Sequence, residues 1–205
     1  GDTVAQYTTI SDAVTNATGN TNYTVVVADG EYREQGSQID ISNNAVAVNA
    51  ASGASPVVNI SRDNYLTLGT TDGSTVDGLT FEGNSNNQNA ITDGGSFNAS
   101  ITSNEFRNFS SGTPVVNLAP GTSNTESLII DGNIFSEGIQ ADAIQVDASS
   151  STDGDSIVIS NNEITLAGDK NAIDLDDGNN GDFTIEINAI EGNENAVTVV
   201  SLATS

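Results

Sequence analysis

The chain has 205 residues, of which 36% are hydrophobic, and its 28 acidic side chains outnumber four basic ones, giving a formal net charge of −24 at pH 7. Nucleic acids and anionic lipid surfaces are bound through lysine and arginine, so this charge excludes both classes of partner. The sequence has no cysteine and no histidine, which excludes disulfides and imidazole chemistry, and no apolar run approaches the about 20 residues of a membrane-spanning helix.

The first predicted element is a short helix over residues 9–18. Thr9 and Asp12 have the spacing of a capping box, and Gly19 provides a helix stop. Apolar residues recur at the spacing of one helix face: Ile10, Ala13, Val14 and Ala17. We expect this helix to cover the open end of the repeats that follow, within a cap region that comprises residues 1–20.

From residue 21 onward, short apolar strands recur along the chain in two series. The first series begins at Val76, Ile101, Ile130, Ile159 and Ile185. The second series is centred on Ile91, Val116, Ile144, Ile173 and Val197. Both series advance by 24–29 residues, and two independent series with the same step indicate a repeating structural unit.

A repeat of this length is too short for a strand–helix–strand crossover, yet it can wind once around a narrow core. The strands alternate apolar and polar side chains, and seven Asp-Gly dipeptides mark turns. Equivalent strands of successive coils would stack in parallel about 4.8 Å apart. The sequence therefore predicts an all-β fold with one domain, residues 1–205, in which residues 21–205 form a right-handed, single-stranded parallel β-helix of about seven coils.

Three segments resemble a known group of β-helix proteins: residues 7–14, residues 25–34, which read VVVADGEYRE, and residues 75–81, which read TVDGLTF. They are similar to the first helix, the buried strand after it and a regular coil of the pectin-lyase-like superfamily. The resemblance implies a right-handed parallel β-helix. Because this superfamily contains lyases, hydrolases, esterases, phage tailspikes, adhesins and plain surface domains, the resemblance implies no particular chemistry.

One polar residue recurs at a constant position of the repeat, namely Asn104, Asn133, Asn162 and Asn188. Stacked in register, these amides can hydrogen-bond to one another and to the backbone of the turns. We predict that they form a structural asparagine ladder, which resembles the ladder of the superfamily.

An acidic segment near the end of the chain is the candidate metal site, with Asp174, Asp176, Asp177 and Asp182 as ligands. Ca²⁺ takes six to eight oxygen ligands, and an acidic loop that also contains glycine and asparagine offers such oxygens. The alternative is a solvated acidic turn without a metal. Ca²⁺ is the only cofactor that the sequence indicates.

Asp176 and Asp177 also form the carboxylate pair that a glycosidase would need for acid and base roles. The related hydrolases carry histidine and a basic substrate clamp as well, whereas Arg107 is the only arginine in the regular coils. The charge of −24 would repel an anionic polysaccharide. The sequence therefore favours a non-catalytic role over its two alternatives, a carbohydrate-active enzyme (lyase, hydrolase or tailspike-like depolymerase) and a carbohydrate-binding module.

The acidic excess favours a salt-adapted protein, because molar salt screens self-repulsion of this size. The alternative is an ordinary acidic extracellular domain, with or without Ca²⁺. In either case we expect a secreted or cell-surface location, where cell-surface carbohydrate is a candidate ligand.

The last coil carries no helix, proline or lysine that would protect its exposed edge. We therefore expect it to be covered by self-association or by a following domain. The residues expected at this end are Phe183, Ile185, Ile187, Val197 and Val199. Together these observations predict a structural surface module, either adhesive or filament-forming.

Overall fold

The structure is a computed structural model of the whole chain. It describes residues 6–17, 23–33, 38–41, 46–60, 66–69, 73–83, 89–93, 98–110, 112–119, 127–136, 138–147, 156–176, 182–186, 188–191 and 195–199.

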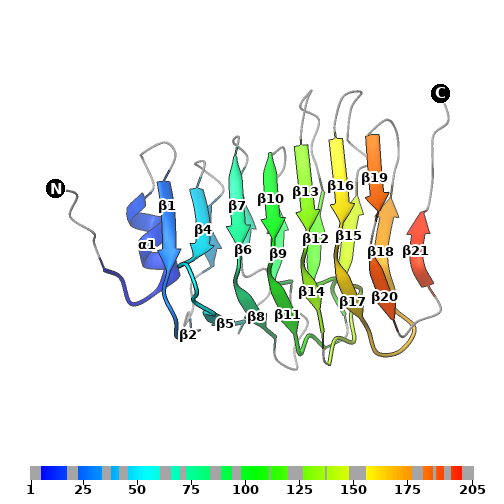
Figure 1. Cartoon of the computed structure of the whole chain (residues 1–205), viewed down its shortest axis with the longest axis horizontal. Coiled ribbons are helices and arrows are strands. Elements are labelled where there is room, and N and C mark those ends of the chain that lie inside the picture. The colour runs from blue at the N-terminus through cyan, green and yellow to red at the C-terminus, as the bar shows by residue number, and fades with distance from the viewer. Residues whose placement is uncertain are drawn as a thin grey trace.

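The chain winds into a parallel β-helix with three sheets (Figure 1), and the described residues place seven strands in each sheet. Neighbouring strands of a sheet come from successive coils and run parallel, as in the pairing of Ile101 with Val76 on one side and with Ile130 on the other. Every coil contributes one strand to each sheet. The predicted all-β, parallel β-helical fold is thus confirmed.

The strands of the three sheets have the following bounds. Sheet A contains β1 (Tyr23–Val27), β4 (Val46–Ala50), β7 (Ser74–Asp77), β10 (Ala99–Thr102), β13 (Ser127–Asp131), β16 (Ser156–Ser160) and β19 (Asp182–Glu186). Sheet B contains β2 (Glu31–Arg33), β5 (Val57–Asn59), β8 (Thr80–Glu82), β11 (Glu105–Arg107), β14 (Ile134–Phe135), β17 (Glu163–Thr165) and β20 (Ala189–Glu191). Sheet C contains β3 (Ile39–Asp40), β6 (Leu66–Leu68), β9 (Ile91–Asp93), β12 (Val116–Leu118), β15 (Ile144–Asp147), β18 (Asn171–Asp176) and β21 (Asn195–Val199).

The core is a set of apolar columns that run along the axis of the β-helix. Within each strand the side chains alternate in direction, so Ala99 and Ile101 of β10 are buried while Ser100 and Thr102 are partly exposed. Stacking in register then places like side chains above one another. Phe81, Phe106 and Phe135 form such a stack on sheet B, with ring centroids 5.3 and 4.7 Å apart and nearly parallel planes.

Helix α1 (Ile10–Ala17) lies at the N-terminal end of the β-helix (Figure 1). It packs against β1 and β3 and buries Ile10, Val14 and Ala17. The main-chain N–H of Asp12 donates a hydrogen bond of 3.2 Å to Thr9 Oγ1, as expected of an N-cap. The predicted helix is therefore present, with the described bounds Ile10–Ala17, and it shields the first coil from water. Among the described residues, no helix has the length and apolar character needed to cross a membrane.

Candidate functional site

The chain passes from sheet A to sheet B through a sharp corner that is repeated from coil to coil. In four coils the corner residue has positive φ, a conformation that favours glycine and asparagine. These residues are Gly78, Ser103, Gly132 and Asn161, with φ of 73°, 55°, 65° and 54°. The residue that follows each of them is buried, and in three of the four coils it is an asparagine.

Asn133 shows how these asparagines connect the coils. Its Nδ2 donates to the carbonyl of Ile101 in the preceding coil, at 2.9 Å, and to Asn162 Oδ1 in the following coil, at 3.0 Å. Its Oδ1 accepts from the main-chain N–H and from Nδ2 of Asn104, at 3.0 and 3.1 Å. Because Asn133 is fully buried, these bonds replace all the contacts that its amide would make with water.

The same bonds repeat along the column, which extends from the main-chain N–H of Leu79 to Asn188. Asn104 donates to the carbonyl of Val76, and Asn162 donates to Asn188 Oδ1 at 2.9 Å. The structure thus brings all four predicted ladder residues into one hydrogen-bonded column, the asparagine ladder.

A second column, the corner ladder, lies two residues earlier in each coil and alternates acidic with hydroxyl side chains. In register order it contains Asp77, Thr102, Asp131, Ser160 and Glu186. Thr102 Oγ1 donates to Asp77 Oδ1 at 2.7 Å, and Ser160 Oγ donates to Asp131 Oδ1 at 2.6 Å. The alternation separates carboxylates that would otherwise repel each other across adjacent strands.

Hydrogen bonding in the corner ladder also affects ionisation. The hydrogen bond from the Ser160 hydroxyl lowers the pKa of Asp131, and the hydrogen bond from the Asn161 amide lowers it to a smaller extent.

We did not predict the corner ladder from the sequence, although its signal is present. An acid or a hydroxyl stands two residues before each ladder position, and the two kinds alternate from one coil to the next.

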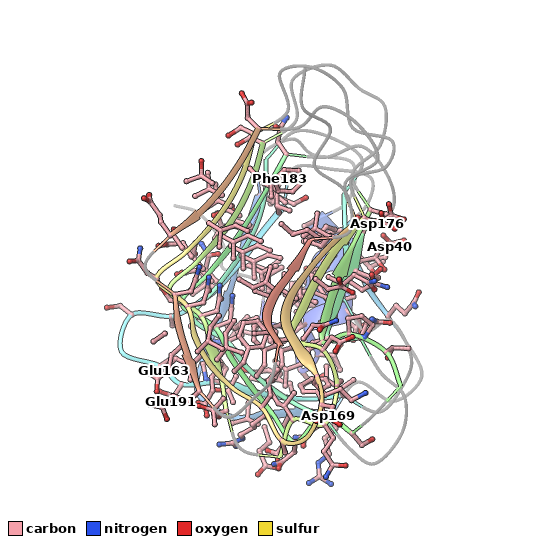
Figure 2. All side chains as sticks on the ribbon, turned by 90° about the vertical axis from the view of Figure 1, so that its right-hand side faces the viewer. Asp40, Glu163, Asp169, Asp176, Phe183 and Glu191 are labelled. Atoms are coloured by element: carbon pink, nitrogen blue, oxygen red, sulfur yellow. The ribbon has the colours of Figure 1, made fainter. Side chains whose placement is uncertain are left out.

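Three of the four predicted calcium ligands are described, and these three do not form a group that could hold a metal ion. Asp174 and Asp176 lie on β18 in sheet C, with Asp176 at the end of that strand (Figure 2), whereas Asp182 begins β19 in sheet A. Asp177 lies outside the described residues. Among the described part of the chain, no group of three acidic side chains is close enough to hold a metal ion.

Asp174 is instead surrounded by like charge on the outer face of sheet C. Burial raises the pKa of its carboxyl, and the charges of Asp142 and Asp176 raise it further. Gln145 Nε2 lies 3.5 Å from Asp174 Oδ2, and Asp147 pairs in register with Asp176. The ionised form of Asp174 is therefore unfavourable in the folded protein.

We predict that Asp174→Asn stabilises the protein at pH 7, by about 0.2–1 kcal/mol, the range of partly exposed charge interactions. A raised pKa in the folded state means that the carboxyl supports folding when protonated and that this support is lost as the pH rises through the folded-state pKa. The gain should therefore vanish at low pH, where wild-type Asp174 is neutral. Urea unfolding at pH 7 and pH 3 measures it, and an equal gain at both pH values would contradict the assignment.

Arg107 lies in an ion-pair network on the outer face of sheet B that the sequence did not predict. Its Nη2 is 3.0 Å from Glu82 Oε2, and its Nη1 is 3.9 Å from Glu105 Oε1. Asn108 Nδ2 donates to Glu82 Oε1, and Ser136 Oγ donates to Glu105 Oε1. The Arg107–Glu82 ion pair and the Ser136–Glu105 hydrogen bond connect adjacent coils, whereas Arg107 and Glu105 lie on the same strand, β11. Asp176, one of the two carboxylates considered as a glycosidase pair, lies on a different sheet.

The C-terminal coil exposes part of the apolar core, and Figure 2 looks onto this end with Phe183 on the inner side of its sheet. Phe183 and Ile185 are only partly buried, whereas Ile157 and Ile159, their partners in β16, are 2% and 0% exposed. Ile190 of β20 is partly buried in the same way.

Two of the remaining residues predicted at this end have a described strand position and register. Val197 and Val199 belong to β21, where they pair in register with Ile173 and Leu175 of the buried core. Ile187 lies outside the described residues.

Comparison of the chain with family models, with curated proteins and with solved structures finds no match. The molecule is a parallel β-helix with two polar ladders and a partly exposed last coil.

Proposed function

We propose that the chain is a non-catalytic structural module, a β-helix of the pectin-lyase-like type that serves at an extracellular surface as an adhesive or filament-forming element. The observation that carries this proposal is the asparagine ladder, which runs without a break from Leu79 to Asn188. The polar side chains that recur in this chain are used to connect coils. Such connections suit a rod that spaces or presents contact surfaces.

The distribution of acidic side chains supports adaptation of the protein to a high salt concentration. Acidic side chains stack directly in places, as Asp147 does on Asp176, and the whole chain has a formal net charge of −24. Stacked like charges oppose folding in dilute buffer, and molar salt reduces the repulsion. Secretion or cell-surface display by a salt-adapted organism is consistent with this balance.

The partly exposed last coil supports an assembly role, with self-association or a covering domain at this end. We expect the chain to associate in molar NaCl, and Ile185→Lys to weaken the association at least about tenfold, which corresponds to ~1.4 kcal/mol. Thr184→Lys is the matched control, because it adds the same charge on the exposed face of the same strand. Light scattering over a concentration series measures the effect, and thermal melting checks the fold of each variant. A monomeric chain that is indifferent to Ile185→Lys would contradict an assembly role for this end.

A carbohydrate-active enzyme, or a carbohydrate-binding module, is the second candidate, and the network around Arg107 is the observation that favours it. Glu82 and Glu105 flank one guanidinium on an open sheet face, which is a polar surface of the kind that binds sugar hydroxyls. A screen against neutral and acidic polysaccharides, with and without Ca²⁺, separates the candidates. Depolymerisation that Glu82→Gln and Glu105→Gln abolish would overturn the structural proposal.

A further inference from the structure

The outer face of sheet A carries a column of uncharged side chains that runs through six coils, and we call it the sheet A column. In register order it contains Thr24, Ala47, Thr75, Ser100, Ile129 and Val158. Each of them is partly or fully exposed, and Ile129 is 38% exposed between Leu128 and Ile130, which face the core. The six strands that carry the column lie side by side along the β-helix (Figure 1).

Such a column is unusual in a chain with 28 acidic residues and four basic ones. Within the bounds of β1, β4, β7, β10, β13 and β16, the only charged residues are Asp77 and Asp131. Each stands at the end of its strand and accepts a hydrogen bond from a hydroxyl of the following coil. The outer faces of the other sheets carry acidic residues within their strands, such as Glu105 and Glu163 on sheet B and Asp174 on sheet C.

The uncharged area ends before β19. Thr184 of that strand continues the register of the column, but Asp182 and Glu186 flank it on the same face. In the first two coils the neighbours of the column are instead Val26, which is 64% exposed, and Asn49. The face that can exclude water without burying a row of charges therefore extends from β1 to β16.

Charge decides which kind of partner this face fits. Two copies of the chain repel each other, because each has a formal net charge of −24. They can come into close contact only where both surfaces lack charge, and the sheet A column placed against itself meets this condition. A basic partner would be attracted to the acidic residues of sheets B and C instead, because complementary charge guides association.

The geometry of the column also suits a second copy. Neighbouring members are one strand spacing apart, about 4.8 Å, so the face is a regular series of ridges and grooves. A second copy has the same spacing, and its ridges can fit these grooves along the whole contact. Six strands of four or five residues form a face of about 30 by 15 Å, and two such faces bury on the order of 900 Å². An interface of this area is typical of a weak, reversible complex.

We infer that two copies of this chain associate side by side through the outer face of sheet A, with sheet packed against sheet. The inference rests on the proposed function, in which the chain assembles with itself, and it adds a lateral contact that is separate from the C-terminal coil. Molar salt favours this contact, because it screens the repulsion between the copies and strengthens the burial of apolar side chains.

Crosslinking of single cysteines tests where the copies meet, because the chain has no cysteine of its own. All variants also carry Ile185→Lys, which weakens association through the C-terminal coil. Ser100→Cys places a thiol near the middle of the sheet A column, and Asn117→Cys places one on the outer face of sheet C in the same coil. Packed sheets lie about 10 Å apart, a distance that a short bis-maleimide spans. In molar NaCl we expect Ser100→Cys to give several times more crosslinked dimer than Asn117→Cys.

A matched pair of substitutions in the same Ile185→Lys chain tests whether association depends on this face. Ile129→Asp adds a carboxylate within the column, whereas Ile134→Asp adds one on the outer face of sheet B in the same coil, where Ile134 is 42% exposed. We expect Ile129→Asp to weaken dimerisation at least about tenfold and Ile134→Asp to weaken it less than about twofold, because like charges that face each other across an interface oppose association. Sedimentation equilibrium in molar NaCl measures dimerisation, and thermal melting checks that each variant is folded.

The remaining outcomes separate this inference from the proposed function. If Ile129→Asp and Ile134→Asp weaken association equally, or if the two cysteines crosslink equally, the copies do not meet at sheet A and the inference is overturned. If the wild-type chain associates but the Ile185→Lys chain is monomeric at every concentration, assembly uses the C-terminal coil alone, and the inference fails while the proposed function stands. If the wild-type chain is monomeric as well, both fail.

Discussion

Replacing Asn133 by alanine should lower the free energy of unfolding by at least about 2 kcal/mol, because two buried donors lose their acceptor and each unsatisfied group costs about 1–3 kcal/mol. The donors are the main-chain N–H and Nδ2 of Asn104, which both bind Asn133 Oδ1. The carbonyl of Ile101 loses a hydrogen-bond partner as well. Urea unfolding in molar NaCl measures the change.

Asn117→Ala is the matched control for this substitution. Asn117 also lies in the middle of the β-helix, on β12, but its side chain is directed outward between the buried Val116 and Leu118. Its replacement should change stability by less than about 0.5 kcal/mol, as is usual for surface positions. Equal losses for Asn117→Ala and Asn133→Ala would show that the ladder contributes nothing beyond an ordinary asparagine.

Sodium chloride should raise the melting temperature by on the order of 10 °C between dilute buffer and molar concentration, which corresponds to several kcal/mol for a chain of this size. The cause is a formal net charge of −24, part of it in stacked pairs such as Asp147 and Asp176. Near 1 M salt the screening length falls to about 3 Å, which is shorter than the spacing of neighbouring strands. Thermal melting followed by circular dichroism provides the measurement.

The control for the salt prediction is the same series at pH 4, close to the sequence pI of about 4.1. Net charge is then near zero, and the dependence on salt should be nearly flat. A steep rise at both pH values would indicate that salt acts by strengthening apolar burial, and a flat response at pH 7 would contradict salt adaptation.

The parts of this fold that depend on periodicity could be predicted from the sequence. Inward positions such as Ile101 and Ile130 repeat at almost equal steps, and a residue such as Asn133 keeps its place before the strand of sheet B. In a stacked solenoid, equal position in the repeat means contact, so no separate knowledge of distant pairing is needed.

Contacts between residues at different positions of the repeat could not be predicted from the periodicity. Asp174 and Asp182 are close in sequence, and this closeness led to the calcium hypothesis, yet they belong to different sheets. Arg107 meets Glu82 of the preceding coil, which depends on register between coils of unequal length. The corner ladder was not predicted because acidic and hydroxyl residues alternate in it from coil to coil. The same kind of residue therefore returns only in every second coil.

The stack of Phe81, Phe106 and Phe135 has a consequence for the order in which the molecule comes apart. In a linear array each coil is held only by its two neighbours, so opening begins where the interfaces are weakest. The three stacked rings lie in the coils at the N-terminal end of the asparagine ladder. The coils of β1 and β4 lie outside this ladder, and β19 pairs with a described strand on one side only. We therefore expect the coils of the phenylalanine stack to be the last to exchange their amide hydrogens with water.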